Sequence, residues 1–386
     1  MCRVILRYMS VCSSAVVVET VAVDAPLKLA VIGPAPPPNG GMAMQTAQLV
    51  DLLREEGCDV RFVAVNPAYW PRWMGRIRGV RAGARLLPYL ASLWRELGAV
   101  DVVHLMANSG WSWHLFATPA ILIARLRGKP VVINYRGGQA RVFLRSQARW
   151  VMPVMRRAQA MVVPSGFLRE VFAEWRLDSR VIPNVVMLER FRFKPEAAIA
   201  DPRSPVIAVT RNLESIYGVD VALRAFAGLL SEAPGARLLI AGEGPRAEAL
   251  REQAEELGIS AHTEFLGRLD RDAMIALYQR ADILLNTSRV DNTPNSLIEA
   301  MAVGVAIVST RAGGIPFLVE DGHNALLCAV DDDACLRQAL RRLLHDRELY
   351  RHLVENGRES VEAFDWETVR GQWLSLYHEL AGRAGL

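Results

Sequence analysis

The sequence has no run of about 18 uncharged apolar residues, so it predicts no transmembrane helix. Its five cysteines form no CxxC pair and have no histidine nearby at the spacing of a metal site: Cys2, Cys12, Cys58, Cys328 and Cys335. This scatter predicts neither a zinc site nor a disulfide framework, and it favours a reducing compartment. A GxGxxG turn with an acidic residue about 20 positions further on is also missing, which counts against a dehydrogenase.

Charge of both signs is present, but it is distributed unevenly. Residues 1–200 contain 26 Lys and Arg against 13 Asp and Glu, whereas residues 201–386 contain 19 against 28. The asymmetry indicates a basic first half that meets an anionic partner or surface, or an arginine-rich composition with no partner. A length of 386 residues suits two domains of ordinary size better than one core.

Residues 1–25 begin with basic residues and a short apolar stretch, as a signal peptide does. Glu19 interrupts the apolar stretch, however, and a strand of a nucleotide-binding type follows directly. We interpret residues 1–25 as a disordered extension or a misassigned start, with a cleaved signal as the alternative. The location that we expect is cytoplasmic.

From residue 27 onward, short β-branched runs alternate with amphipathic stretches. The expected strands of the first series are 28–33, 60–65, 100–106, 130–135 and 160–164. The expected helices are 43–56, 81–97, 112–127 and 140–157. Such alternation indicates a doubly wound parallel sheet, whose strands are buried on both faces.

A second series follows the Pro-rich, polar stretch at 193–205. Its expected strands are 206–210, 237–242, 263–267, 282–286 and 305–310, with helices at 219–231, 246–257, 271–280 and 295–303. We therefore expect an N-terminal Rossmann-like domain over 26–200 and a C-terminal Rossmann-like domain over 201–363. The amphipathic segment 364–386 is expected to pack back on the first domain. Two facing sheets place a ligand in the cleft at the carboxyl ends of their strands.

The loop GPAPPPNGGM (33–42) follows the first expected strand. Gly40 and Gly41 open the next helix without side chains, so that backbone N–H groups can approach a phosphate. Taken alone the motif is weak, because a tight strand-to-helix turn has the same composition.

The strongest motif is SRVDNTPNSLIEAMAVG (288–304). We expect Thr293 to cap a helix and Pro294 to lie in its first turn. The N–H groups at 294–296 and the helix dipole favour a diphosphate there. Asp291 on the loop and Glu299 inside the helix can both accept hydrogen bonds from sugar hydroxyls. A capped helix with a solvated Asp291 is the alternative, but it leaves Glu299 unexplained.

The D-x7-E spacing before AMAVG resembles the E-x7-E signature of the retaining glycosyltransferases of family 4 (glycosyl transferases group 1), which have the GT-B fold. The resemblance covers most of the chain from residue 27 and includes VVPSGFLREVF (162–172), VIPNVV (181–186), LLIAGEGP (238–245) and AGGIPFLVEDGHNALL (312–327). It implies an α/β architecture of two Rossmann-like, doubly wound domains that face a central cleft. The resemblance further implies that residues 26–200 bind the acceptor and that residues 201–363 bind the nucleotide sugar.

The resemblance also implies roles for residues of the cleft. Glu299 would bind the nucleotide ribose, Asp291 the hydroxyls of the donor sugar, and Arg211 the diphosphate. The implied donor-binding residues are Gly40, Gly41, Arg211, Tyr217, Leu266, Gly267, Asn292, Thr293, Pro294, Asn295 and Glu299, and the implied catalytic residues are Asp291, Arg211 and Arg136. No cofactor is implied, because the donor is a UDP- or GDP-linked sugar and the leaving diphosphate takes the acceptor proton.

Two departures from the family pattern affect the charge of the cleft. The Lys expected before Gly218 is Tyr217, which can donate a hydrogen bond but brings no charge. Where relatives tend to carry His before Gly-Gly, this chain has Arg136. A guanidinium cannot act as a base near neutral pH, although it can clamp a phosphate or an anionic acceptor. His104 and His114 lie near other strand ends, where a structural role is the commoner one.

The resulting function is a hexosyltransferase in surface-polysaccharide or glycolipid assembly, with a saccharide or lipid-linked acceptor. The alternative is a non-catalytic relative that binds a nucleotide sugar or a partner protein without turnover. A metal is not expected, because Asp270 and Asp272, although they match DxD, begin a helix where Asp is an ordinary cap. Asp331, Asp332 and Asp333 have the same explanation.

Two arginine-rich stretches fall in the first half of the chain. Residues 69–87 interleave arginines with Trp70 and Trp73, and Arg141, Arg145 and Arg149 form a stripe at helical spacing. Basic residues with Trp suit an anionic membrane face, which would make the protein peripheral on the inner face of the plasma membrane. A solvated helix face is the alternative. Nucleic acid is not expected, because no recognition fold is apparent.

Overall fold

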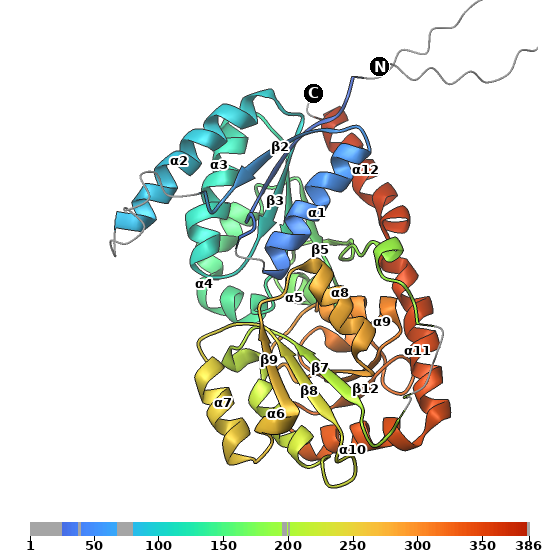
Figure 1. Cartoon of the computed structure of the whole chain (residues 1–386). Helices are drawn as coiled ribbons and strands as arrows, with labels where there is room; N and C mark the ends of the chain where they lie inside the picture. The colour runs from blue at the N-terminus through green and yellow to red at the C-terminus, as the bar shows by residue number, and fades with distance from the viewer. Residues whose placement is uncertain (1–24, 38–39, 68–79, 195–198, 200, 384–386) are drawn as a thin grey trace, which may run out of the picture.

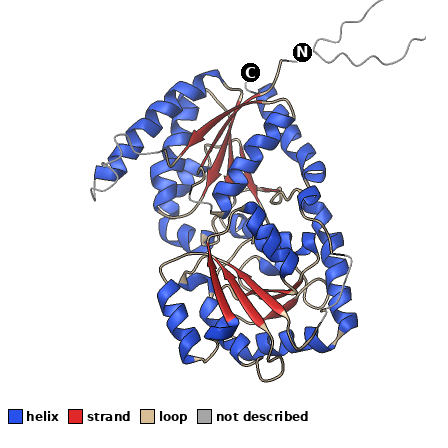
Figure 2. Cartoon of the chain, viewed as in Figure 1, coloured by secondary structure: helices blue, strands red, loops and turns tan. Residues whose placement is uncertain are grey.

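The structure is a computed structural model that describes residues 25–37, 40–67, 80–194, 199 and 201–383. Two six-stranded sheets form separate layers, one above the other in Figure 1, and helices cover both faces of each sheet (Figure 2). The chain therefore has an α/β fold, as predicted. Residues 1–24 of the expected N-terminal extension and residues 69–79 of the first arginine-rich stretch lie outside the described residues.

The first sheet has the order β2-β1-β3-β4-β5-β6, and all its pairings are parallel. Its strands are β1 (Lys28–Gly33), β2 (Asp59–Ala64), β3 (Val102–Ala107), β4 (Val131–Tyr135), β5 (Ala160–Val163) and β6 (Arg180–Val181). Every residue of β3 and β4 is buried, because helices pack on both faces of the sheet.

The second sheet has the order β12-β11-β10-β7-β8-β9, again with parallel pairings only. Its strands are β7 (Val206–Thr210), β8 (Arg237–Ala241), β9 (Thr263–Gly267), β10 (Ile283–Asn286), β11 (Ala306–Thr310) and β12 (Leu326–Cys328). The strand order reverses between β1 and β3 in the first sheet and between β7 and β10 in the second. Ligands of doubly wound sheets bind outside the carboxyl ends of the strands at such points.

The helices that follow the strands of the first sheet are α1 (Gly41–Glu55), α2 (Val80–Glu96), α3 (Thr118–Leu126), α4 (Ala140–Met155) and α5 (Gly166–Ala173). Those of the second sheet are α6 (Val219–Ala227), α7 (Ala247–Glu256), α8 (Arg271–Arg280), α9 (Asn295–Val303), α10 (Asp333–His345) and α11 (Arg347–Val361). The segment expected as a helix over 112–127 is helical in the structure, but Trp113–Ala117 is a π-helical segment that leads directly into α3. None of the described helices combines the length and apolar character needed to cross a membrane.

The last helix, α12 (Trp366–Arg383), returns to the first sheet. Trp366, Trp373 and Tyr377 are buried together with β1 side chains in one apolar cluster. The chain crosses between the domains twice, and the two crossings are bonded to each other. The N–H of Val186 donates to the carbonyl of Phe364 at 2.9 Å, and the N–H of Leu188 donates to the Asp365 carboxylate at 3.3 Å.

The cysteine interpretation needs a correction. Cys328 ends β12 and Cys335 lies in the first turn of α10, and the structure joins them in a disulfide with a Cα–Cα distance of 5.8 Å. A short strand-to-helix connection brings the two residues together, which the scatter of cysteines along the sequence did not suggest. Each of the two aspartate-rich segments caps a helix, as predicted. Asp270 accepts from the N–H of Ala273, and Asp332 accepts from the N–H of Cys335.

Candidate active site

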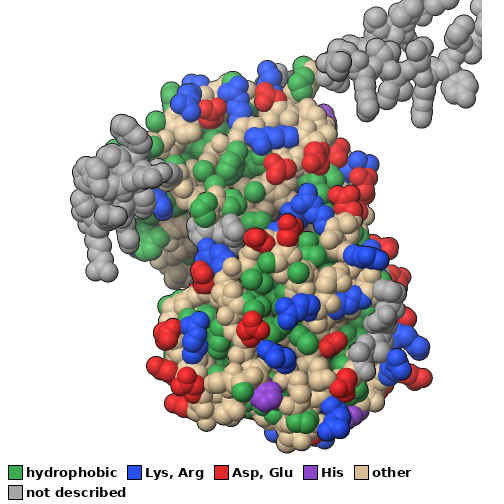
Figure 3. Space-filling model, viewed as in Figure 1, with side chains coloured by type: hydrophobic (Ala, Val, Ile, Leu, Met, Phe, Trp, Pro, Cys, Tyr) green, Lys and Arg blue, Asp and Glu red, His purple; other side chains and the backbone are tan. Residues whose placement is uncertain are grey.

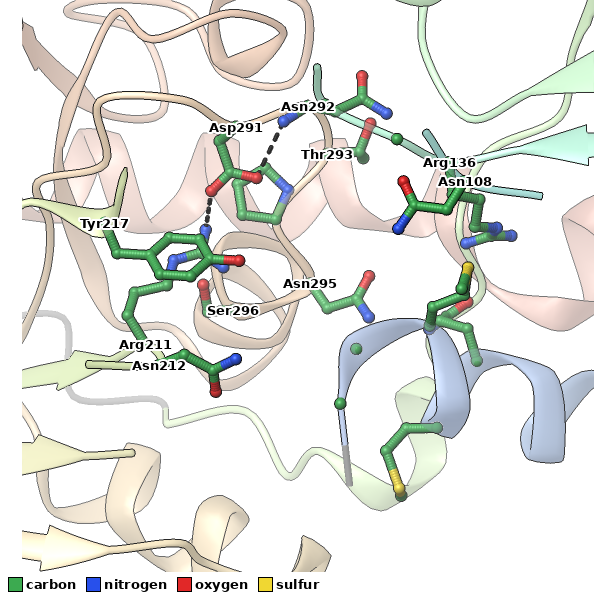
Figure 4. Close-up of a pocket in the computed structure, with 18 of the residues that line it drawn as sticks. Asn108, Arg136, Arg211, Asn212, Tyr217, Asp291, Asn292, Thr293, Asn295 and Ser296 are labelled. Atoms are coloured by element: carbon green, nitrogen blue, oxygen red, sulfur yellow. Dashed lines mark hydrogen bonds and ion pairs between the residues drawn. The ribbon is translucent and has the colours of Figure 1, made fainter. Parts of the chain in front are cut away.

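A cavity of about 990 Å³ lies between the two sheets, where both strand orders reverse. Its first-domain wall comes from the start of α1, the loop after β3 and the loop after β4. Its second-domain wall comes from the loops after β7 and β10 and the start of α9. Most of the predicted site residues line it: Gly40, Gly41, Arg136, Arg211, Tyr217, Asp291, Asn292, Thr293, Pro294, Asn295 and Glu299. Figure 4 shows Arg211, Tyr217 and Asp291 on one side and Arg136 with Asn108 on the other.

Two predicted residues, Leu266 and Gly267, lie at the end of β9 and just outside the residues that line the cavity. The next residues along the chain, Arg268 and Leu269, line it instead. Gly267 has a φ of +67°, and this turn directs the chain from the strand towards the cavity.

Helix α9 begins at the expected residue, but its N-cap differs from the expectation. The helix begins at Asn295, Pro294 occupies the N-cap position with a ψ of 117°, and no side chain caps it. The prediction that Thr293 caps the helix is therefore wrong, because Thr293 lies one residue too early. Pro294 also has no N–H, so the donors at this end are the N–H groups of Asn295 and Ser296.

Two hydroxyl groups at this helix end lack partners. Thr293 Oγ1 and Ser296 Oγ are buried and form no hydrogen bond among the described residues, although both residues line the cavity. Leaving a buried polar group unpaired costs about 1–3 kcal/mol. Two such groups beside free N–H groups and the positive end of a helix dipole form a site that an anionic oxygen would satisfy.

Arg211 follows β7, and its guanidinium forms an ion pair with Asp291. Its Nε donates to Asn286 Oδ1 at 3.0 Å, so two neighbouring strand ends fix its orientation. Asp291 also accepts from the hydroxyl of Ser288 at 3.2 Å and from the N–H of Asn292 at 2.9 Å. The dashed lines in Figure 4 mark its bonds to Arg211 and Asn292. Asp291 is thus held by three donors.

Tyr217 lies beside this pair. The Arg211 guanidinium is 5.3 Å from the centre of the Tyr217 ring. Gly218 has a φ of +60°, and a Cβ there would lie 2.2 Å from the carbonyl oxygen of Thr287. Only glycine fits this close approach, which fixes Tyr217 next to the end of β10.

Glu299 lies one turn inside α9 and faces the cavity from a largely enclosed position. Tyr278 of α8 donates to its carboxylate at 2.9 Å. Burial raises the pKa of Glu299 to about 7, and the Tyr278 hydrogen bond opposes this rise only in part. Near neutral pH the group is thus poised between its two forms.

Arg136 follows β4, and its partners are neutral amides. Its Nε donates to Asn134 Oδ1 at 3.3 Å, and Nη1 donates to Asn184 Oδ1. Asn184 in turn donates to Asn295 Oδ1 at 2.6 Å and to the carbonyl of Thr293 at 3.1 Å. Asn184 thus links the first domain to the start of α9. Asn184 belongs to the VIPNVV motif, but the sequence alone suggests no role for it, because its partners are more than 40 residues away.

His104 and His114 lie in different environments. His104 is fully buried in the first sheet, and its Nδ1 lies 2.7 Å from the Tyr377 hydroxyl. Burial lowers the pKa of His104 to about 3, with Arg136 as a second cause. His114 lines the cavity. Among the residues that the structure describes, no group of three or more His, Cys, Asp or Glu side chains is arranged to hold a metal ion.

Two family models match this chain in succession. "Glycosyltransferase Family 4" matches residues 39–190, and "Glycosyl transferases group 1" matches residues 191–360. Together the matches extend over both sheets and most of the helices around them.

Named relatives support the same family. The chain is 26% identical over 368 residues to the phosphatidyl-myo-inositol mannosyltransferase of Mycobacterium leprae, covering 89% of this chain and 94% of the relative. It is 29% identical over 335 residues to the glycogen synthase of Mycobacterium tuberculosis, covering 82% and 76%. A further match, 32% identical, to the N-acetyl-alpha-D-glucosaminyl L-malate synthase of Bacillus anthracis spans only 49% of each chain.

Solved structures share the fold. HepE from Anabaena, in complex with UDP and glucose, superposes with a TM-score of 0.72 at 17% identity, covering 92% of this chain and 100% of that one. The sucrose-phosphate synthase of Thermosynechococcus elongatus gives a TM-score of 0.74 at 20% identity, with the same coverage. The chain therefore belongs to family 4 of the glycosyltransferases and has the GT-B fold.

Proposed function

We propose that this glycosyltransferase retains anomeric configuration and moves a hexosyl unit from a UDP- or GDP-linked donor to a saccharide or lipid-linked acceptor, in the cytoplasm and without a metal. The observation that carries the proposal is the start of α9. Its two unpartnered hydroxyls and free N–H groups, with Arg211 on the same wall of the cavity, suit a diphosphate.

The acids of the cavity fit the two ends of a sugar nucleotide. Glu299 accepts from the ribose hydroxyls, and Asp291 lies at the sugar end. Asp291 is a poor candidate for a covalent nucleophile, because its oxygens are shared among Arg211, Ser288 and the N–H of Asn292. This arrangement supports front-face attack with the leaving diphosphate as the base, a reaction that depends on positioning and on stabilised negative charge.

The surface of the first domain, which we expect to bind the acceptor, supports a role in surface-polysaccharide or glycolipid assembly. Seven large apolar side chains are 39–78% exposed on α2, α3, α4 and the connections around them: Leu87, Trp94, Trp111, Leu122, Leu126, Val142 and Trp150. We call this set the apolar face. Arg127 stacks on Trp94 and Arg149 on Trp150, each at 4.9 Å. Trp111 and Val142 also line the cavity, so the apolar face reaches its mouth.

This surface suits the anionic inner face of a membrane that carries a lipid-linked acceptor. Arg145 and Arg149 are exposed on α4, as a membrane contact requires. Arg141 of the same stripe forms an ion pair with Glu174 at 2.9 Å and lies over the Phe167 ring, so its charge is partly neutralised within the protein. By contrast, acidic and basic side chains are interspersed on the face of the second domain seen in Figure 3.

The test is nucleotide release from a panel of UDP-, GDP- and ADP-sugars, with and without EDTA, and with cell lipid extract as acceptor. We expect release from one donor, unaffected by EDTA and increased by the extract. The anomeric configuration of the product, read by NMR, tests retention.

The opposite outcome favours another function. Nucleotide binding without release from any donor, in the presence of the extract, would support a non-catalytic relative. Tyr217 and Arg136, which replace the expected Lys and His, are the observations behind that alternative.

A further inference from the structure

Arg136 is a largely enclosed cation that no carboxylate neutralises. Both of its hydrogen-bond acceptors, Asn134 and Asn184, are neutral amides, and no ion pair involves it among the described residues. Burial alone lowers the pKa of Arg136 to about 10, with no acid acting in the other direction. Removing a cation from water without a counter-ion is costly, and the cost is recovered when an anion binds.

The first-domain wall of the cavity around Arg136 also lacks negative charge among the described residues. The side chains that the first domain contributes to the cavity include amides, hydroxyls, aromatics and methionines but no Asp or Glu within the described residues: Met42, Met44, Gln45, Gln48, Asn108, Ser109, Trp111, His114, Gln139, Val142, Phe143, Ser146 and Gln147. The acids of the cavity, Glu243, Asp270, Asp291 and Glu299, all come from the second domain. The first-domain wall therefore carries net positive charge.

The donor diphosphate has a separate set of partners. Arg211, Thr293 Oγ1 and Ser296 Oγ belong to the second domain, whereas Arg136 faces the cavity from the first. Figure 4 shows Arg136 and Asn108 across the cavity from Arg211 and Tyr217. An acceptor must lie between the donor sugar and the first domain, so its substituents meet Arg136.

We propose that Arg136 binds a carboxylate or phosphate group of the acceptor and thereby selects anionic acceptors over neutral ones. The proposal rests on the proposed function, whose donor occupies the second-domain wall. A guanidinium suits this task because its planar donors match both kinds of oxyanion. Asn108 and His114, on the same wall, offer further donors.

The first experiment measures anion binding and needs no turnover. The protein is saturated with whichever of UDP and GDP binds, and inorganic phosphate or malonate is then titrated by calorimetry. Wild type is compared with Arg136→Gln and Arg136→Lys. Arg169→Gln, an exposed change on α5 of the same domain, is the matched control for loss of one charge. Circular dichroism confirms that each variant is folded.

We expect an anion to bind wild type and Arg169→Gln alike, at least tenfold more weakly to Arg136→Gln, and with partial recovery in Arg136→Lys. Nucleotide affinity should be retained in Arg136→Gln. Failure of both anions to bind wild type, or equal binding to Arg136→Gln, would overturn the proposal. So would a tenfold loss of nucleotide affinity in Arg136→Gln, because Arg136 would then hold the donor diphosphate.

A second experiment applies once a donor is known and separates the two kinds of anion. Initial rates are compared for acceptor pairs that differ only in a phosphate or only in a carboxylate. In one of the two pairs, we expect the kcat/KM of wild type to be at least tenfold higher for the anionic acceptor than for the neutral one, because the anionic acceptor has the lower KM. Arg136→Gln should lose this preference. Equal or better use of the neutral members by wild type would refute the assignment. A total absence of transfer with intact anion binding would contradict the proposed function but not the anion site.

Discussion

Among single residues, Glu299 and Tyr217 offer the most direct tests of the proposed donor site. Their backbone positions follow from the sequence motifs around them, but their environments do not. The Glu299 carboxylate is bonded to Tyr278, which lies 21 residues earlier on a different helix. The Tyr217 ring lies beside Arg211 only because Gly218 allows the chain to approach Thr287. Contacts between distant segments set the charge state of both positions.

Replacing Glu299 tests the ribose assignment. Glu299→Ala should weaken UDP or GDP binding about 10- to 100-fold, since hydrogen bonds to a charged group contribute about 1.5–3 kcal/mol. The pKa of Glu299 is raised to about 7, so wild-type affinity should increase as pH rises through 7 and the carboxylate forms. Glu299→Gln should show no such increase. Calorimetry between pH 6 and 8 measures both effects, and near-wild-type affinity of Glu299→Ala would contradict the assignment.

Tyr217→Lys tests whether this position faces the diphosphate. A Lys there would add a cation beside Arg211, and one well-placed donor contributes about 2–4 kcal/mol to a transition state. Turnover should therefore be preserved or raised. Tyr217→Phe, which keeps the ring beside Arg211, is the control for loss of the hydroxyl. If Tyr217→Lys folds normally but loses turnover while Tyr217→Phe does not, the position does not serve the leaving group.

His104 should make the first domain sensitive to acid. Folding lowers the pKa of His104 from 6.5 to about 3, so the unfolded chain binds one more proton between these values. The free energy of unfolding should fall as pH falls below 6.5, by up to about 1.4 kcal/mol per pH unit. His104→Gln cannot titrate and should lose this dependence. Urea midpoints at pH 7.5 and 5.5 measure it, and identical shifts in both proteins would refute the assignment.

At the scale of elements, the sequence predicted strands better than helix ends. Nearly continuous apolar runs identify β3, β4 and β10, because strands covered on both faces have no solvent-exposed positions. The start of α9 at Asn295 was predicted correctly, but its cap was not, because Pro294 and not Thr293 occupies the N-cap position and no side chain caps the helix. Helix α4 was predicted with its arginine stripe, but the ion pair of Arg141 with Glu174 depends on how α4 and α5 pack.

Helix α4 carries the sharpest test of the membrane contact. Trp150→Ser and Arg149→Ser should each weaken binding to vesicles that contain anionic lipid, since a basic residue near such a surface contributes about 1 kcal/mol. Binding of wild type should fall as salt is raised. Leu257→Ser, an exposed apolar position on the second domain, should have no effect. Sedimentation with anionic and with neutral vesicles measures these differences. Equal sedimentation of all variants would exclude the apolar face as the contact.

For the whole molecule, the sequence predicted two doubly wound sheets and a helical C-terminus, because short apolar runs and amphipathic stretches reveal the alternation of strands and helices. It did not predict which residues of one domain meet those of the other. Arg136, Asn184 and Asn295 are joined across the cavity by side-chain hydrogen bonds whose members are 48 and 111 residues apart. The disulfide between Cys328 and Cys335 likewise depends on the fold.

The return of α12 should stabilise the first domain, although the helix follows the second in sequence. Trp373 is buried against the first sheet, and Trp373→Ala should cost about 3–5 kcal/mol through the cavity it leaves. All nine tryptophans lie within residues 70–175 or in α12, so tryptophan fluorescence reports on this unit. Its urea midpoint should fall in Trp373→Ala and remain near wild type in the exposed control Trp150→Ser. An unchanged midpoint would show that α12 adds little.

The paired crossings between the domains determine how the cleft can open. Val186 and Asp365 lie side by side, and the backbone bond from Val186 to Phe364 ties the outgoing chain to the returning one. The two connections between the domains are therefore held together and form one hinge region. Asn184 lies two residues from Val186 and contacts both Arg136 and the first residue of α9. A ligand that engages Arg136 or the start of α9 would therefore act close to the paired connection between the domains.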